Sequence, residues 1–233
     1  MNSPGGDRSV SVPVMGNARV VSVNAGCGQD AEWAGKLKRT AIDKRPVTAE
    51  VHVGLLGLDG DEQSDQHNHG GPEQAVYAYA REDLDWWAGR LRRELRDGAF
   101  GENITTEGLD VTGALIGETW RLGTVVVQVT SPRIPCITFR NWLSEKGWVR
   151  RFREGGRPGA YLRVLRPGTV RAGSGAELLS RPPRGVTIAA VMEAFYEHDA
   201  GIIGEMLAVP GHNRRWDSMA EDLLAPETQT AGR

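Results

Sequence analysis

Short segments with alternating apolar and polar residues run through most of the chain. Residues 18–23 and 47–53 have this period of two, so we expect a strand at each. Further short strands are expected in four apolar runs, at 75–79, 124–130, 160–164 and 177–180. Gly and Pro separate these segments, which is typical of a β-barrel or sandwich rather than a parallel α/β sheet.

The apolar period changes to that of a helix in two parts of the chain. Residues 81–96 carry Leu84, Trp87, Leu91 and Leu95 at helical spacing, which predicts an amphipathic helix. Near the other end, three short helices are expected, at 186–197, 202–207 and 216–224.

The segment Arg181-Pro182-Pro183-Arg184-Gly185 marks a boundary between the strand-rich part and the helical part. We therefore expect a mainly β chain: a β-rich body at 17–183, a barrel or a sandwich, followed by a small unit of three helices at 184–225. The Gly-, Ser- and Pro-rich residues 1–16 predict a disordered leader, and residues 226–233 a disordered tail.

Composition narrows the class of protein. Lys and Arg number 28 against 30 Asp and Glu, so the net charge of −2 gives no field that would recruit nucleic acid or a membrane surface. No apolar run approaches the ~18 residues of a transmembrane helix. The two cysteines form no disulfide framework, which favours a reducing, cytoplasmic location.

Residues 57–71 form a loop rich in Asp, His and Gly. Its side chains Asp59, Asp61, His67 and His69 are of types that bind metals. The spacing does not fit an EF-hand loop, and no second His/Cys pair has zinc-site spacing. A polar loop with capping Asp residues and tight glycine turns explains the same residues, so both interpretations stay open.

Residues 100–106 form a second polar segment. Gly101 allows the backbone to approach a ligand, and Glu102 and Asn103 offer hydrogen-bonding groups. A plain turn after the preceding helix, with Asn103 bonded to backbone, is the alternative.

The third segment is Ser131-Pro132-Arg133-Ile134-Pro135-Cys136-Ile137, in which two prolines stiffen the chain before a cysteine. A cation such as Arg133 near the thiol would favour the thiolate, which is a soft ligand suited to a redox metal. An inert, buried cysteine is the alternative.

Taken together and in this order, the three segments resemble the MOSC family over roughly residues 40–180. The matching pieces are Thr40-Ala41-Ile42-x-Lys44, Gly57-x-x-Gly60-Asp61-x-Gln63-x-Asp65, His69-Gly70-Gly71, Ala75-Val76-Tyr77-x-Tyr79, Phe100-Gly101-Glu102-Asn103, Ile116-Gly117-Glu118 and Pro132-Arg133-x-Pro135-Cys136. Each piece is weak alone, but their order and spacing are specific. Glu118 stands where the family has Asp, which keeps the acidic character.

The resemblance implies a MOSC-type β-barrel with a few helices. The helical end of the chain further resembles the stand-alone bacterial branch that includes hydroxylaminopurine reductase. The implied cofactor is a molybdenum-pyranopterin bound through Cys136, and the implied activity is reduction of N-hydroxylated compounds to amines. Because no flavin, haem or iron–sulfur motif is visible, electrons would come from a separate donor protein. The other implied partner is a small N-hydroxylated substrate, and a homodimer is among the assemblies that the sequence allows.

The resemblance assigns the metal ligand Cys136, and side-chain chemistry suggests roles for the other residues. Cys136, His69 and Asn103 are the candidate catalytic residues. The candidates for cofactor binding are Arg133, Lys44, Arg39, Gly70, Gly71, Gly101 and Glu102. Two alternative functions remain: a sulfur carrier with a persulfide on Cys136, and a divalent-metal hydrolase that uses the Asp and His side chains of the 57–71 loop.

Overall fold

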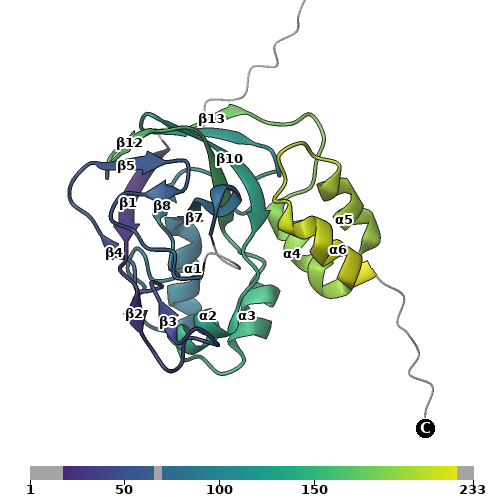
Figure 1. Ribbon diagram of the computed structural model, residues 1–233, viewed down its shortest axis with the longest axis horizontal. Coiled ribbons are helices and arrows are strands. Elements are labelled where there is room, and N and C mark those ends of the chain that lie inside the picture. Colours follow the sequence, from purple (N-terminus) through teal and green to yellow (C-terminus); the bar gives the residue numbers. More distant parts are fainter. Residues whose placement is uncertain (1–17, 66–69, 225–233) are drawn as a thin grey trace, which may run out of the picture.

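The computed structural model describes residues 18–65 and 70–224 (Figure 1). Its main feature is an eight-stranded sheet, in the order β13 (Ala176–Ser180), β9 (Thr119–Leu122), β10 (Val125–Pro132), β11 (Ala160–Arg166), β7 (Val76–Ala80), β8 (Ile104–Glu107), β1 (Arg19–Ala25), β4 (Arg45–Pro46). A three-stranded sheet contains β12 (Gly168–Val170), β5 (Val51–Gly54) and β6 (Gly57–Leu58), and β2 (Gln29–Asp30) pairs with β3 (Arg39–Thr40).

Each strand expected from the sequence is present, with shifted ends. The strand expected at 47–53 begins only at Val51. Residues 45–46 form the separate strand β4 beside β1, and the Val47 amide donates to the Val23 carbonyl of β1 at 2.8 Å. β7 is central in the large sheet, and all five of its residues are buried. Its sequence therefore does not alternate between apolar and polar residues.

No closed barrel is detected among the described strands, so the barrel prediction is not confirmed. The end strands of the large sheet, β13 and β4, do not pair with each other. β4 is two residues long and ends in Pro46, which has no N–H to donate to a ladder. β13 runs into Pro182 and Pro183. A bridge between Arg19 and Gly175, with backbone hydrogen bonds such as those between Val20 and residues 173–174, joins β1 to the chain before β13.

The large sheet is mixed rather than purely antiparallel. β7 and β8 pair in parallel, and the helix α1 (Arg81–Leu91) crosses between them, as a parallel pair requires. This helix is shorter than the expected 81–96. Arg92 takes a left-handed conformation (φ 51°) that ends α1, and Arg81 holds the following turn by donating to Asp97.

Two helices between β10 and β11 were not expected from the sequence: α2 (Ile137–Leu143) and α3 (Trp148–Gly155). They bury Phe139, Trp148 and Phe152, whose rings pack edge-to-face or tilted at centroid distances of 5.2–5.5 Å. Full burial of each such ring contributes on the order of 2–3 kcal/mol to stability. This aromatic cluster supports the loop that carries Cys136.

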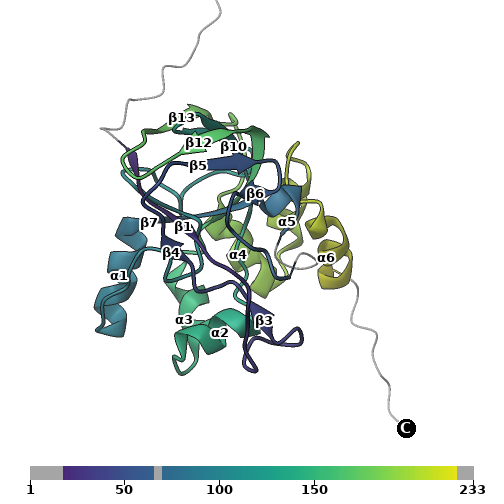
Figure 2. The same ribbon diagram turned by 60° about the vertical axis from the view of Figure 1, so that its left-hand side comes forward.

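Three helices follow the sheet, as expected: α4 (Ile188–Glu197), α5 (Ala200–Leu207) and α6 (Arg215–Leu224). Both ribbon views show them packed together on one side of the sheet (Figures 1 and 2). Val191, Met206 and Trp216 belong to the same hydrophobic core as the sheet strands. Because the sheet and the helices share this core, the expected division into domains at 17–183 and 184–225 stays a prediction.

None of the helices in the described part of the chain is long and apolar enough to cross a membrane. The expected leader at 1–16 and tail at 226–233 lie outside the described residues.

Candidate functional site

Cys136 is the last residue before α2, where the chain leaves β10 through Pro132 and Pro135. Its backbone is extended (φ −98°, ψ 174°), and its sulfur accepts a hydrogen bond from the Phe139 amide at 3.5 Å. The side chain is partly exposed and lines a cavity of about 1070 Å³. A thiolate at such a position is stabilised by the first amides of the helix.

Arg133 is buried close to this cysteine. Its guanidinium lies 4.0 Å from the centre of the Phe139 ring and 5.1 Å from that of Tyr77, and it donates to the Phe100 carbonyl. Among the described residues, its buried Nε has no hydrogen-bond partner. Arg133 therefore places a fixed positive charge, with one unused donor, in the wall of the cavity.

The charge of Arg133 interacts with its neighbours. Burial disfavours the charged form, but the phenols of Tyr161 and Tyr77 and the sulfur of Cys136 outweigh it and raise the pKa of Arg133 above its usual value. By the same attraction, the guanidinium favours a thiolate at Cys136.

Lys44, Asp61 and Asn103 form a buried polar group in the cavity wall. Lys44 makes an ion pair with Asp61, and Asp61 also accepts from Asn103 Nδ2 and from the Gly26 amide, both at 2.9 Å. Burial lowers the pKa of Lys44 below its usual value although Asp61 opposes the shift. The Oδ1 of Asn103 accepts from the Tyr77 amide at 3.1 Å, so the amide side chain is already engaged at both ends.

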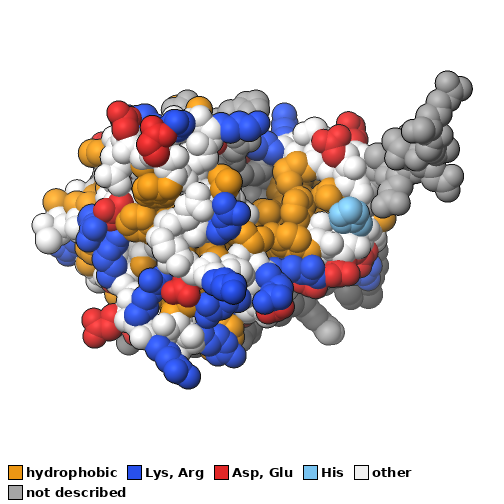
Figure 3. Space-filling model, turned by 90° about the horizontal axis from the view of Figure 1, so that it is seen from below, with side chains coloured by type: hydrophobic (Ala, Val, Ile, Leu, Met, Phe, Trp, Pro, Cys, Tyr) orange, Lys and Arg blue, Asp and Glu red, His pale blue; other side chains and the backbone are white. Residues whose placement is uncertain are grey.

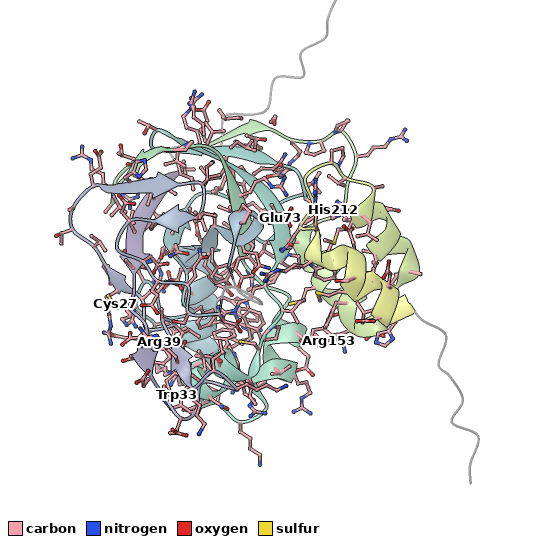
Figure 4. The ribbon with its side chains drawn as sticks, in the orientation of Figure 1. Cys27, Trp33, Arg39, Glu73, Arg153 and His212 are labelled. Carbon is pink, nitrogen blue, oxygen red and sulfur yellow. The ribbon has the colours of Figure 1, made fainter. Side chains whose placement is uncertain are left out.

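Arg39 lies at the more exposed part of the cavity wall. Its guanidinium pairs with Asp30 at 3.3 Å and with Glu62 at 3.1 Å. The hydrogen bond that Arg39 donates to Asp30 and the negative charge of Glu62 raise the pKa of Arg39. Figure 4 shows Arg39 on the same side as Cys27 and Trp33, away from the C-terminal helices. Arg39 is therefore a partly exposed cation of the cavity wall, unlike the buried Arg133.

Gly101 and Glu102 are neighbours with different environments. Gly101 lines the cavity with φ 75°, and a Cβ there would lie 2.9 Å from Ile42 Cγ1. Glu102 is not among the described lining residues. It is fully buried and accepts from the amides of Gly98 at 2.5 Å and Phe100 at 2.9 Å. It therefore shapes the loop that presents Gly101.

Gly70 and Gly71 are also absent from the described lining residues. Their amides donate at 3.2 Å to the side chains of Gln74 and Gln63, respectively, so neither is presented to an anion. His69, the remaining candidate catalytic residue, lies outside the described residues, as does His67.

The carboxylates proposed for a hydrolase do not converge. Asp61 forms a buried ion pair with Lys44. The side chain of Asp59, by contrast, is 75% exposed and lies 3.6 Å from His52. Within residues 18–65 and 70–224, no group of three or more His, Cys, Asp or Glu side chains could hold a metal ion.

Several lining residues were not among the candidate site residues from the sequence. The rings of Tyr77 and Tyr161 lie 5.1 Å apart in the wall, and burial raises the pKa of both phenols, so they stay neutral. Asn213, Trp216 and Met219 reach the cavity from the C-terminal segment. Strand pairing and helix packing bring these positions together, and local patterns carry no information about either.

The described residues that line the cavity include more cations than carboxylates. On the face seen from below, the side on which α2 and α3 lie, Lys and Arg side chains gather around apolar ones (Figure 3). Leu37 and Ile137, which are 55% and 51% exposed, line the cavity. The arrangement can bind an anionic group and present one thiolate to a soft metal.

Comparisons with known proteins find similar sequences. The family model for the MOSC domain matches residues 65–177, which include Asn103, Arg133 and Cys136. The chain is 40% identical over 181 residues to the uncharacterized protein YflK of Bacillus subtilis, covering 78% of this chain and 81% of YflK. It is 31% identical over 167 residues to a protein of Gibberella moniliformis named "Reductase", covering 70% of this chain and 29% of that protein.

Among solved structures, YiiM from Geobacillus stearothermophilus has a similar fold. The TM-score is 0.75 at 29% sequence identity, and the match covers 89% of this chain and 100% of that one.

Proposed function

Because the chain belongs to the MOSC domain family, we propose that it is a molybdenum-cofactor-dependent reductase that converts small N-hydroxylated compounds to amines. The observation that carries the proposal is the position of Cys136 in the wall of a 1070 Å³ cavity beside the buried cation Arg133. The similarity to a fungal protein named a reductase supports redox chemistry.

The residues present fit such a cofactor. Cys136 offers one soft thiolate, which suits molybdenum better than the oxygen donors of the cavity do. Arg133 has an unused buried donor at Nε, and an Arg is well suited to a phosphate or pterin oxygen. Lys44 and Arg39 add positive charge but are held by carboxylates, so we assign the direct contact to Arg133.

When bound, the cofactor supplies two electrons that, with two protons, convert N–OH to N–H and water. Cys136 would hold the metal, and Arg133 would keep its sulfur deprotonated. Asn103 would act indirectly, because its side chain holds Asp61 and the Tyr77 amide. We propose His69 as the proton donor, because an imidazole side chain is suited to donate and accept protons near neutral pH. A separate donor protein would deliver the electrons.

The test uses full-length protein from a host that synthesises the molybdenum cofactor. The proposal predicts bound molybdenum and pterin, and reduction of hydroxylaminopurine with chemically reduced methyl viologen as electron source. Transferable sulfur on Cys136 without reduction would favour a sulfur carrier instead. Stoichiometric zinc without molybdenum would favour a hydrolase, and either result would refute the reductase.

A further inference from the structure

The C-terminal segment forms part of the cavity wall. Asn213 precedes α6, and Trp216 and Met219 lie in its first turns; all three line the cavity together with Cys136. The match to the MOSC domain ends at residue 177, so this part of the wall lies outside the matched region. The family comparison therefore assigns it no role.

Asn213 fixes the start of α6 to the strand that leads to Cys136. It is fully buried, its amide donates to the Thr130 carbonyl at 3.1 Å, and its Nδ2 donates to Ser131 Oγ at 3.3 Å. Both partners belong to the end of β10, two or three residues before Arg133. A buried, bonded Asn between two elements fixes their register, because displacement would leave its polar groups unsatisfied.

A second set of bonds holds the same junction. Glu73 accepts from the Arg214 amide at 2.7 Å and from Arg163 at 3.0 Å, and its carbonyl accepts from Thr130 at 2.7 Å. Figure 4 shows Glu73 and His212 close together where the sheet meets the C-terminal helices. His212 in turn bonds Asp217 of α6 at 2.9 Å. The first turns of α6 are therefore held from both sides.

Trp216 and Met219 differ in how firmly they are packed. Trp216 is 3% exposed, belongs to the main core and meets the Phe195 ring edge-to-face at 5.8 Å. Met219 is only partly buried, so its side chain can change size without emptying the core. Together they give an apolar surface whose aromatic ring and thioether suit a flat ring system.

We propose that Trp216 and Met219 hold the non-reacting body of the substrate, and that Met219 limits its size. This proposal rests on the proposed reductase function. The cations at Arg39, Lys44 and Arg133 suit the anionic cofactor, whereas these two side chains carry no charge. A substrate with a planar body, such as a nucleobase, would lie against α6 with its N–OH group toward Cys136.

The experiment changes the volume at position 219 in both directions. Met219→Trp and Met219→Ala are prepared in molybdenum-loaded, full-length protein and assayed with methyl viologen on hydroxylaminopurine and on hydroxylamine itself. We expect Met219→Trp to raise KM for hydroxylaminopurine about tenfold with little change in kcat. Both variants should reduce hydroxylamine, which is too small to reach this wall, at the wild-type rate.

Met219→Ala should admit a purine that carries an extra ring substituent and that the wild type reduces poorly. Leu165→Ala, at an exposed apolar position on β11, is the matched control and should leave KM unchanged for both hydroxylaminopurine and hydroxylamine.

Equal effects of the Met219 substitutions on hydroxylaminopurine and hydroxylamine, or no effect on either, would overturn the proposal. Loss of molybdenum in Met219→Trp would also overturn it, because Met219 would then contact the cofactor. If the wild type reduces neither compound, the reductase function itself fails, which is a different result.

Discussion

Lys44 and Asp61 form an ion pair in the cavity wall in which only 9% and 3% of the two side chains are exposed. They lie on different loops, and Asp61 is further bonded to Asn103 and to the Gly26 amide. The pair therefore connects the N-terminal loops to the segment that precedes β8. Since each charge has lost its water, each depends on the other.

Asp61→Asn should lower the free energy of unfolding by about 3 kcal/mol, because it leaves the Lys44 ammonium buried without a counter-charge. Urea denaturation of the two proteins measures the difference. Glu177→Gln is the control, since the Arg121–Glu177 pair is 43% and 59% exposed and should contribute less than about 1 kcal/mol. A change in Asp61→Asn no larger than in the control would show that the pair does not stabilise the fold.

Arg133→Met should make Cys136 less reactive, because the cation that favours the thiolate is removed. In a Cys27→Ser background and without cofactor, the rate of alkylation by iodoacetamide at neutral pH should fall about tenfold. Arg140→Met removes an exposed cation of α2 and should leave the rate unchanged. Equal alkylation rates in Arg133→Met and wild type would contradict the role given to Arg133.

Glu102 should make stability depend on pH. Burial raises the pKa of its carboxyl from 4.5 to about 7, so between these values the folded protein binds more protons than the unfolded chain. The free energy of unfolding should therefore fall as pH rises from 4.5 to 7 and level off above that. Denaturation at a series of pH values measures this slope.

In Glu102→Gln, position 102 carries no group that titrates between pH 4.5 and 7. The difference in free energy of unfolding between this variant and the wild type should therefore change across that pH range. Glu107→Gln, at a side chain 46% exposed, is the control and should show no such change. A constant difference between wild type and Glu102→Gln at all pH values would mean that Glu102 keeps an ordinary pKa.

Local pattern was sufficient for most strands and for the C-terminal helices. The alternation at 18–23 predicted β1, although its residues Ser22, Val23 and Asn24 are buried in succession. The helical spacing at 186–197 predicted α4, which buries one face. The short helix α2 was missed, since its seven residues offer only Phe139 and Leu143 as buried positions. The closed barrel was expected by family resemblance, and sequence pattern alone does not determine how sheet edges pair.

The candidate site was predictable only where its residues are adjacent in sequence. Arg133 and Cys136 were found together because they share one stiff loop. Glu102 was expected in the cavity on its polarity, but its carboxylate is turned to the amides of Gly98 and Phe100. Asn213 lies more than eighty residues from the strand it bonds, and such contacts exist only after folding.

The most direct test of the central claim is the sulfur coordination of bound molybdenum, measured by X-ray absorption at the molybdenum edge. Wild type, Cys136→Ser and Cys27→Ser would be compared after production in a host that makes the cofactor. If Cys136 binds the metal, Cys136→Ser holds molybdenum with one sulfur ligand fewer than wild type, or holds none, while Cys27→Ser gives the wild-type spectrum. Bound molybdenum with unchanged sulfur coordination in Cys136→Ser would contradict the assignment.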